Sequence, residues 1–365
     1  MDNNLPDNFD SHKEEHDVSG FSAIELIKKV QRNFGIAALA MVMGAMATHE
    51  ASAQCTPERE TFVAMNAETG EILIDHDGNE KIQPASMTKM MTLLLAYEAM
   101  EDGLIDEDDR IYIATGTYLR GDMERFSGWR SPVKFGDALA GAAVRSYNDL
   151  AATIAENVAK VRGVGNTETD FISLMNERAR EIGMDSTVFY NSSGLPASLI
   201  RAKGKGSTTH DMAVLLKHIA DEHPDLLQLM GTSEAHVRRL NLRNTNTLLH
   251  KDDLPYDEVY GKTGFTCKTG FALTAFVRKG DESIIASYVG GKNVKDRELD
   301  FMALLDEAFE KLEEEQQEIP EIIPASMHPP PLWDPYLDNW PHNMKGQDPD
   351  HTWHHRPFDH DHIPD

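Results

Sequence analysis

The segment from Ser86 to Met100, SMTKMMTLLLAYEAM, most strongly constrains what this chain can fold into. Its apolar side chains recur at helical spacing with very few polar interruptions, which predicts a helix buried on most sides. Such a helix needs other elements packed around it, and 365 residues, 40% of them hydrophobic, are enough to build that core. The sequence therefore predicts a globular domain around a rigid central helix and excludes a disordered or fibrous chain.

Segments with the pattern of β-strands lie on both sides of the predicted helices. Residues 61–77 alternate apolar and polar side chains around the turn Glu68-Thr69-Gly70, which predicts a hairpin. Further strands are expected at 258–262, 272–277 and 283–289, and further helices at 167–182, 209–220 and 295–317. A helical region is also expected at 135–159, with Ser146-Tyr147-Asn148 interrupting it. Strands at both ends with helices between them indicate an α+β domain whose sheet is assembled from distant segments.

Charge and cysteine content exclude several classes of protein. The chain has 61 acidic and 35 basic side chains, a formal net charge of −26, and this argues against nucleic acid as a partner because phosphate binding needs a basic face. The only cysteines are Cys55 and Cys267, too few for a disulfide-dense scaffold or a cysteine zinc cluster. No motif in the sequence implies a metal, nucleotide or organic cofactor.

Residues 1–53 have the features of a signal peptide with an extended acidic first part. The apolar run of residues 34–47, FGIAALAMVMGAMA, follows Lys28, Lys29 and Arg32 and precedes the A-x-A site Ala51-Ser52-Ala53. A membrane span needs roughly 20 apolar residues, so a permanent span is the weaker interpretation. We expect an exported, periplasmic protein that is soluble after cleavage near Gln54, with the true start codon left open.

The composition changes again in residues 319–365. This segment holds ten of the 17 prolines and seven of the 16 histidines, and proline-rich tails of this kind cannot build a core. We therefore expect a disordered acidic tail. Histidines alternating with carboxylates leave loose metal binding open, and any partner of the tail is unknown.

Ser86 and Lys89 are the first residues whose pattern suggests chemistry. They stand at i and i+3 at the start of the buried helix, which places the lysine nitrogen within reach of the serine oxygen. A serine hydroxyl becomes a useful nucleophile when a base takes its proton, and a lysine can be that base when an apolar setting lowers its pKa. Taken alone, Ser-x-x-Lys also fits an N-cap serine followed by a surface lysine.

Two more motifs follow in order, Ser146-Tyr147-Asn148 and Lys262-Thr263-Gly264, the latter on a predicted strand. With them the chain resembles the penicillin-interacting serine transferases, whose motifs are Ser-x-x-Lys, Ser-x-Asn and Lys-Thr-Gly. More narrowly it resembles the low-molecular-mass D-alanyl-D-alanine carboxypeptidases, through the segments PASMTKMMT, SYNDLA, FYNSSGLP, STTHDMAVLL, NTNTLL and GKTGFTCKTG. The resemblance implies a catalytic domain over residues 54–318, with an antiparallel sheet covered by helices and an all-helical subdomain.

The resemblance also implies a reaction. Ser86 would attack the carbonyl of the penultimate D-alanine of a peptidoglycan pentapeptide and form an acyl-enzyme, with Lys89 as general base. Ser146 would bridge the lysines and pass a proton to the leaving D-alanine. Water would then release the shortened peptide. Penicillins and other β-lactams would acylate the same serine and inhibit the enzyme.

Substrate binding is implied for five further residues. Asn148 would bind the peptide amide of the substrate, and Lys262 with the hydroxyl of Thr263 would hold its terminal carboxylate. Gly264 would let the substrate backbone approach the strand closely. The backbone N–H of Phe265, together with that of the nucleophile, would form the oxyanion hole.

Two Lys-Thr-Gly triplets occur, starting at Lys262 and Lys268. We assign Lys262 to the site, because Gly261 precedes this triplet and Phe-Thr follows it, and Lys268 to structure at the turn into the next strand. Some family members place an arginine at the position of Thr245 to help grip the carboxylate. Carboxylate recognition in this chain is therefore expected to depend more on Lys262 and Thr263.

Other functions stay open on the sequence. A class A β-lactamase shares the three motifs but uses a Glu-x-x-x-Asn segment, and none lies between Ser146 and Lys262. A D,D-endopeptidase would use the same residues. A wall-binding protein with a silent site is the alternative from a different class, and the intact motifs argue against it.

Two structural questions remain from the sequence. Cys55 and Cys267 could form a disulfide in an oxidising compartment, but the sequence does not establish that they are close enough.

The helix expected at 295–317 ends in Glu313-Glu314-Glu315, which an anionic membrane surface would repel. Packing on the sheet is therefore its expected use, and no strong membrane anchor is predicted. The oligomeric state is not specified.

Overall fold

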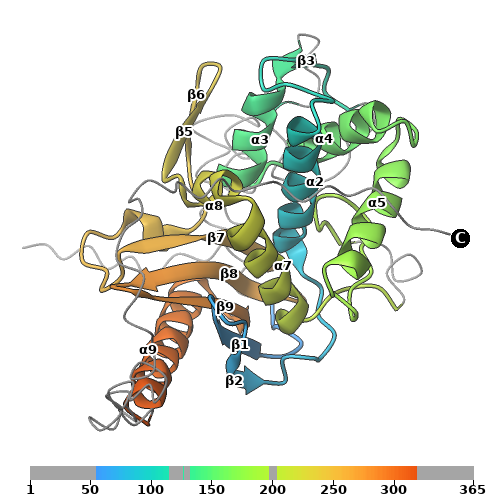
Figure 1. The fold of residues 1–365 in the computed structure, drawn as a ribbon. Coiled ribbons are helices and arrows are strands. Elements are labelled where there is room, and N and C mark those ends of the chain that lie inside the picture. The colour runs from blue at the N-terminus through green and yellow to red at the C-terminus, as the bar shows by residue number, and fades with distance from the viewer. Residues whose placement is uncertain (1–54, 115–125, 127–131, 197–203, 319–365) are drawn as a thin grey trace, which may run out of the picture. The chain divides into compact units, whose positions relative to one another are not determined.

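The computed structural model describes residues 55–114, 126, 132–196 and 204–318 (Figure 1). The expected leader at 1–53 and the expected tail at 319–365 lie outside the described residues. Contacts divide the chain into two units after Glu315, and all the described elements except the last residues of the final helix belong to the first unit. None of the described helices is long and apolar enough to cross a membrane.

The described elements alternate as an α+β chain should. The helices are η1 (Ala85–Thr88), α2 (Lys89–Glu101), α3 (Phe135–Val144), α4 (Asn148–Val161), α5 (Glu168–Glu181), α7 (Thr209–Glu222), α8 (Pro224–Gly231), η3 (Thr247–His250) and α9 (Val294–Glu318). The strands are β1 (Thr61–Asn66), β2 (Ile72–His76), β3 (Arg110–Ile111), β4 (Val133–Lys134), β5 (Glu234–Val237), β6 (Leu240–Arg243), β7 (Glu258–Thr266), β8 (Gly270–Lys279) and β9 (Glu282–Gly291).

The main sheet is antiparallel, with strand order β2-β1-β9-β8-β7. The predicted hairpin is confirmed: β1 pairs with β2 across a turn in which Gly70 has a φ of +77°. β1 also pairs with β9, so that Thr61 lies opposite Val289, and the prediction of a sheet assembled from distant segments is confirmed. β7 is left at one edge, where its outward backbone groups have no neighbouring strand in the described sheet.

Helices cover both faces of this sheet (Figure 1). Alternate residues of a strand point to opposite faces, so Leu273 and Val277 of β8 pack with Phe301 and Leu305 of α9, whereas Ala272 joins the core on the side of α7. The prediction that the last helix packs on the sheet is therefore confirmed.

The predicted central helix is α2. It contacts α3, α4, α5, α7 and α8, and its leucines Leu93 and Leu94 are fully buried, each contributing roughly 1.5–3 kcal/mol by leaving water. Even the polar Thr92 is buried, because its hydroxyl donates to the carbonyl of Ser192 at 2.7 Å. This helix is the rigid support on which the site is built.

The interruption expected at Ser146-Tyr147-Asn148 within the helical region 135–159 is confirmed. It divides the region into α3 and α4, because Ser146 adopts a φ of +65° that turns the chain from the first helix into the second. The short helix α8 and the hairpin of β5 and β6 were not expected from the sequence, because elements of eight and four residues are too short for a periodic pattern to be recognised.

Candidate active site

Ser86 lies in the one-turn helix η1, which leads directly into α2. The preceding residue, Ala85, has a φ of +49°, a left-handed conformation that is costly for a residue with a side chain. Gly194 packs against this bend, and a Cβ added there would lie 1.6 Å from the carbonyl oxygen of Ala85. The strained bend is held in place by a neighbouring loop. It presents Ser86 to a pocket of about 650 Å³ that all three motifs adjoin, described below.

Lys89 begins α2 and is fully buried, directly behind Ser86. Its Nζ lies 3.0 Å from Ser86 Oγ and donates hydrogen bonds of 2.8 Å to Asn148 Oδ1 and to the backbone carbonyl of Ser193. A neutral amine has two N–H groups and one lone pair, and the two carbonyl oxygens can only accept. The lone pair of neutral Lys89 is thus left for the hydroxyl of Ser86.

The surroundings of Lys89 favour this neutral form. Burial lowers the pKa of Lys89 well below its usual value, and the positive charge of Lys262 lowers it further, while Asp149 opposes the shift. The pKa of Lys262 is itself lowered to about 7, first by burial and then by the nearby charge of Arg297. The two lysines and the arginine therefore form a cationic cluster that favours the neutral form of Lys89.

The second motif is arranged differently from the expected roles. Ser146 lines the pocket beside Ser86, but its buried Oγ makes no hydrogen bond to a described residue, so it does not bridge the two lysines here. Asn148, expected to meet the substrate amide, accepts from Lys89 through its side-chain oxygen, and this contact leaves its NH2 group for another partner. The reason is that Ser146 lies in the turn and faces the pocket, whereas Asn148 begins α4 and faces α2.

The third motif lies on the edge strand β7, next to η1. Lys262 is 1% exposed, and Thr263 lines the pocket and hydrogen-bonds Thr245 through the two hydroxyls at 2.7 Å. Gly264 also lines the pocket, and a Cβ at this position would lie 3.0 Å from the carbonyl of Pro84, so the glycine lets the strand approach η1 closely.

The second Lys-Thr-Gly triplet is structural in the described chain, as predicted. Lys268 is exposed and pairs with Glu58 at 2.8 Å. Thr269 donates to the carbonyl of Gln83 at 2.7 Å, and Gly270, with a φ of +71°, packs against Pro57 in the turn from β7 to β8. None of these contacts faces the pocket.

The same turn holds the disulfide left open by the sequence. Cys55 is bonded to Cys267, with their Cα atoms 4.7 Å apart. The bridge joins the first described residue to the loop that follows the third motif. A disulfide is typical of proteins that fold in an oxidising compartment.

One pocket of about 650 Å³ brings the three motifs together. Among the described residues that line it none is acidic, in a chain with a net charge of −26. Three arginines line it, together with several serine, threonine and aromatic side chains. The full set of described lining residues is Ser86, Arg145, Ser146, Arg243, Asn244, Thr245, Thr247, His250, Thr263, Gly264, Phe265, Phe271, Val294 and Arg297. The pocket therefore suits an anionic ligand.

Two contributors to this site were missed in the sequence. Ser193 acts through a backbone carbonyl, which has no side-chain signature, although its segment FYNSSGLP was noted. Arg297 stands in a charged helix and looks in the sequence like an ordinary surface residue, yet it is 2% exposed. Only the packing of α9 against the pocket distinguishes it.

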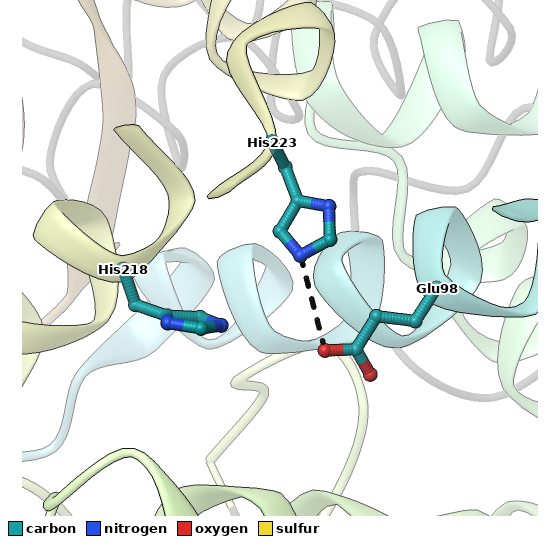
Figure 2. Close-up of side chains that lie close together, drawn as sticks. All are labelled: Glu98, His218 and His223. Atoms are coloured by element: carbon teal, nitrogen blue, oxygen red, sulfur yellow. Dashed lines mark ion pairs between the residues drawn. The ribbon is translucent and has the colours of Figure 1, made fainter. Parts of the chain in front are cut away.

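A separate cluster of Glu98, His218 and His223 joins α2 to the end of α7 (Figure 2). Their ligand atoms lie within 4.8 Å of one another, a composition that could suit a metal ion. Arg178, however, donates to Glu98 at 2.7 Å and lies 3.0 Å from His218 Nε2, while His223 contacts Glu101 at 3.0 Å. The guanidinium already supplies the positive charge, so we interpret the cluster as an ion-pair network.

Comparison with solved structures shows which known fold the chain has. The chain resembles penicillin binding protein 6B from Escherichia coli, with a TM-score of 0.59 and 27% identity over 72% of this chain and 78% of that one. It resembles penicillin binding protein 5 from Haemophilus influenzae similarly, with a TM-score of 0.60 and 26% identity over 69% and 70%. The fold is thus that of the penicillin-binding proteins, as the sequence resemblance implied.

Comparison of sequences identifies the family. Residues 46–293 match the family model described as D-alanyl-D-alanine carboxypeptidase, and the chain belongs to this family. It is 31% identical to D-alanyl-D-alanine carboxypeptidase DacF of Bacillus subtilis over 262 residues. This alignment covers 70% of this chain and 63% of the relative. DacC of Escherichia coli is 30% identical over 241 residues, covering 64% and 57%. The match thus spans about three-fifths of the length of these relatives.

Proposed function

We propose that this protein is an exported serine D-alanyl-D-alanine carboxypeptidase, inhibited by penicillins, that removes the terminal D-alanine from peptidoglycan stem peptides. The observation that carries the proposal is the position of Lys89, whose Nζ lies 3.0 Å from Ser86 Oγ while its N–H groups are used by two carbonyl oxygens. Family membership supplies the substrate class.

In the acylation step, Ser86 Oγ bonds to the carbonyl carbon of the penultimate D-alanine and its proton passes to Lys89. The oxyanion that develops would be held by the backbone N–H groups of Ser86 and Phe265, a contribution of about 3 kcal/mol for each donor. The C–N bond then breaks, and the leaving amine takes a proton. The buried hydroxyl of Ser146, which has no hydrogen-bond partner among the described residues, is suited to deliver that proton, in exchange for one from Lys89.

In the second step, water adds to the ester carbon and its proton returns to the base. The C–O bond to Ser86 breaks and Ser86 Oγ takes a proton from Lys89, which restores the free serine and the neutral amine and releases a peptide shorter by one residue. Lys89 serves as the base in both directions.

Two features support a peptide with a free C-terminus as the substrate. β7 is an edge strand in the described sheet, and an extended peptide can add to such an edge through backbone hydrogen bonds. The strand itself carries Lys262 and Thr263, and three arginines line the adjoining pocket, where none of the described lining residues is acidic, which suits a carboxylate. Export is supported by the signal-like residues 1–53 and by the disulfide between Cys55 and Cys267.

The test is intact-mass spectrometry of the purified protein with excess benzylpenicillin, followed by peptide mapping of the adduct and by D-alanine release from a D-Ala-D-Ala-terminated peptide. A stable adduct on Ser86 together with D-alanine release supports the proposal. Hydrolysed penicillin without an adduct would favour a β-lactamase, and the absence of both adduct and turnover would favour a silent wall-binding protein. Cleavage of crosslinked peptides without D-alanine release would favour an endopeptidase.

A further inference from the structure

The carbonyl of Ser193, one of the two that orient Lys89, belongs to a loop rather than to a helix or strand. Lys89 Nζ donates to this carbonyl at 2.8 Å. Loops are more mobile than the elements they connect, and a backbone carbonyl points wherever its loop places it. The geometry at Lys89 therefore depends on what holds residues 191–195.

Asn191 closes this loop on itself. Its Oδ1 accepts from the backbone N–H of Gly194 at 2.6 Å and from that of Ser193 at 3.2 Å. Its Nδ2 donates to the carbonyl of Leu195 at 2.7 Å. These bonds give the loop its local shape, as asparagine side chains often do in turns, but they join it to no other element. Contacts from outside the loop are needed to place the carbonyl of Ser193 beside Lys89.

Two side chains from neighbouring helices supply such contacts, and both hold Ser192. From α2, Thr92 Oγ1 donates to the carbonyl of Ser192 at 2.7 Å. From α5, Glu168 Oε1 accepts from the backbone N–H of Ser192 at 3.0 Å and from its Oγ at 2.7 Å. Ser192 is fully buried, so these bonds take the place of bonds to water. The residue next to Ser193 is thus fixed to two helices through its N–H, its hydroxyl and its carbonyl.

The carboxylate of Glu168 is the stronger of these two contacts. One oxygen accepts two hydrogen bonds, and bonds to an ionised acceptor are roughly twice as strong as neutral ones. The start of α5 is already capped by Thr167 and Asp170, whose capping box does not involve Glu168. Glu168 is not among the described residues that line the pocket, so it acts on the site only through Ser192.

We propose that Glu168 is a positioning residue for the reaction, because by holding Ser192 it fixes the carbonyl of Ser193. This carbonyl in turn directs the lone pair of neutral Lys89 toward Ser86. Without the carboxylate, one N–H of Lys89 would lose its fixed acceptor, and the lone pair would point at the serine for a smaller fraction of the time. The inference rests on the proposed function, since it takes Lys89 as the base.

The experiment follows acylation of Ser86 by intact mass in the full-length mature protein, over a series of benzylpenicillin concentrations. The series separates the rate constant at saturation from the half-saturating concentration. We expect Glu168→Ala to lower the saturating rate constant about 10–100-fold, since a misplacement of about 1 Å can cost about 100-fold in rate. The half-saturating concentration should stay at the wild-type value, because only the transition state loses an interaction.

Two conservative variants separate the reach of the side chain from its charge. Glu168→Gln keeps an acceptor oxygen for both donors of Ser192 but removes the charge, and it should retain most of the wild-type rate. Glu168→Asp keeps the charge at the start of α5 but is shorter by one methylene group, and it should be slower than the glutamine variant. Because aspartate is favoured in the first turn of a helix, Glu168→Asp also answers the question if Glu168→Ala does not fold.

Asp170→Ala is the matched control. It removes a carboxylate from the same turn of α5, one that bonds to Thr167 and to the backbone N–H of Asn166 rather than to the loop. We expect this variant to be less stable in urea denaturation, because the helix loses its cap, and to acylate at the wild-type rate.

The outcomes separate this inference from the proposed function. A wild-type saturating rate in the folded alanine or aspartate variant of Glu168 would overturn the inference alone. An equal loss in Asp170→Ala, or a change confined to the half-saturating concentration, would also overturn it, because either would show a general effect on the fold. A faster Glu168→Asp than Glu168→Gln would assign the effect to charge and reject positioning. A wild type that forms no adduct on Ser86 would contradict the proposed function, and the inference with it.

Discussion

The amine of Lys89 lies 3.0 Å from the hydroxyl of Ser86, and its two other described partners are carbonyl oxygens that can only accept hydrogen bonds. This arrangement orients the lone pair of a neutral lysine toward the serine. Removal of the amine should therefore remove the base. We expect Lys89→Met to slow acylation of Ser86 by benzylpenicillin by about 10²–10⁴-fold, the usual contribution of a general base.

A time course of the intact mass measures this rate. The matched control is Lys268→Met, since Lys268 belongs to the second Lys-Thr-Gly triplet and pairs with Glu58 on the surface. The control is expected to acylate at the wild-type rate. Rapid acylation of a folded Lys89→Met protein, or a comparable loss in the control, would show that the base has been assigned to the wrong lysine.

The bend at Ala85 should depend on Gly194. In Gly194→Ala the new methyl group would meet the carbonyl oxygen of Ala85 at 1.6 Å, and the residue would also be held at a φ of +80°. We expect a protein that is destabilised by more than about 3 kcal/mol or that loses acylation of Ser86. Gly163→Ala is the control, because its φ is +71° and a Cβ there contacts nothing within 4 Å.

Urea denaturation and penicillin acylation of both glycine variants measure the difference. The control has only the backbone strain, on the order of 1 kcal/mol, and should acylate normally. Equal behaviour of the two variants would mean that the loop at Gly194 does not hold the nucleophile in place.

Lys262 should make stability depend on pH. Its folded pKa of about 7 is below that of the unfolded chain, so between about pH 7 and pH 10 the unfolded state binds more protons. The free energy of unfolding should therefore rise with pH in this window, by at most about 1.4 kcal/mol per pH unit from this group. Lys262→Met should show a smaller slope, which urea denaturation at several pH values can measure. Identical slopes would rule out a titrating, buried Lys262.

The disulfide between Cys55 and Cys267 closes a loop across 212 residues of sequence. By constraining the unfolded chain, such a bridge raises the free energy of unfolding by about 2–4 kcal/mol. We expect the double variant Cys55→Ser and Cys267→Ser to lose about this much stability in urea denaturation without a reductant. The wild type should show no titratable thiol when denatured, and two free thiols would contradict the bridge.

The network of Arg178 with Glu98 should stabilise the helical layer. Both side chains are only partly exposed, at 26% and 17%, so the pair is weaker than a fully buried one. We expect Arg178→Leu to cost about 1–2 kcal/mol because Glu98 and His218 lose their donor. A double-mutant cycle with Glu98→Leu measures the coupling, and simple additivity of the two changes would show that the pair contributes nothing.

The sequence alone determined the central helix, the hairpin at Gly70, the α+β class and the three motifs, because each depends on local signals. Apolar periodicity marks α2, a glycine that can adopt a positive φ marks the turn, and the spacing of Ser86 and Lys89 places both on one side of a helical turn. It also assigned Lys268 to structure, and the structure places this lysine in an exposed ion pair with Glu58.

Only the tertiary structure decided how the site is completed. Ser193 contributes through its backbone, Asn148 faces Lys89, and Arg297 arrives from the last described helix. None of these carries a local signature, since a carbonyl looks the same in every residue and an arginine in a charged helix is usually solvated. The pairing of Cys55 with Cys267 likewise depended on a distance that no spacing encodes. Burial and proximity give these groups their chemistry, and both exist only once the chain is packed.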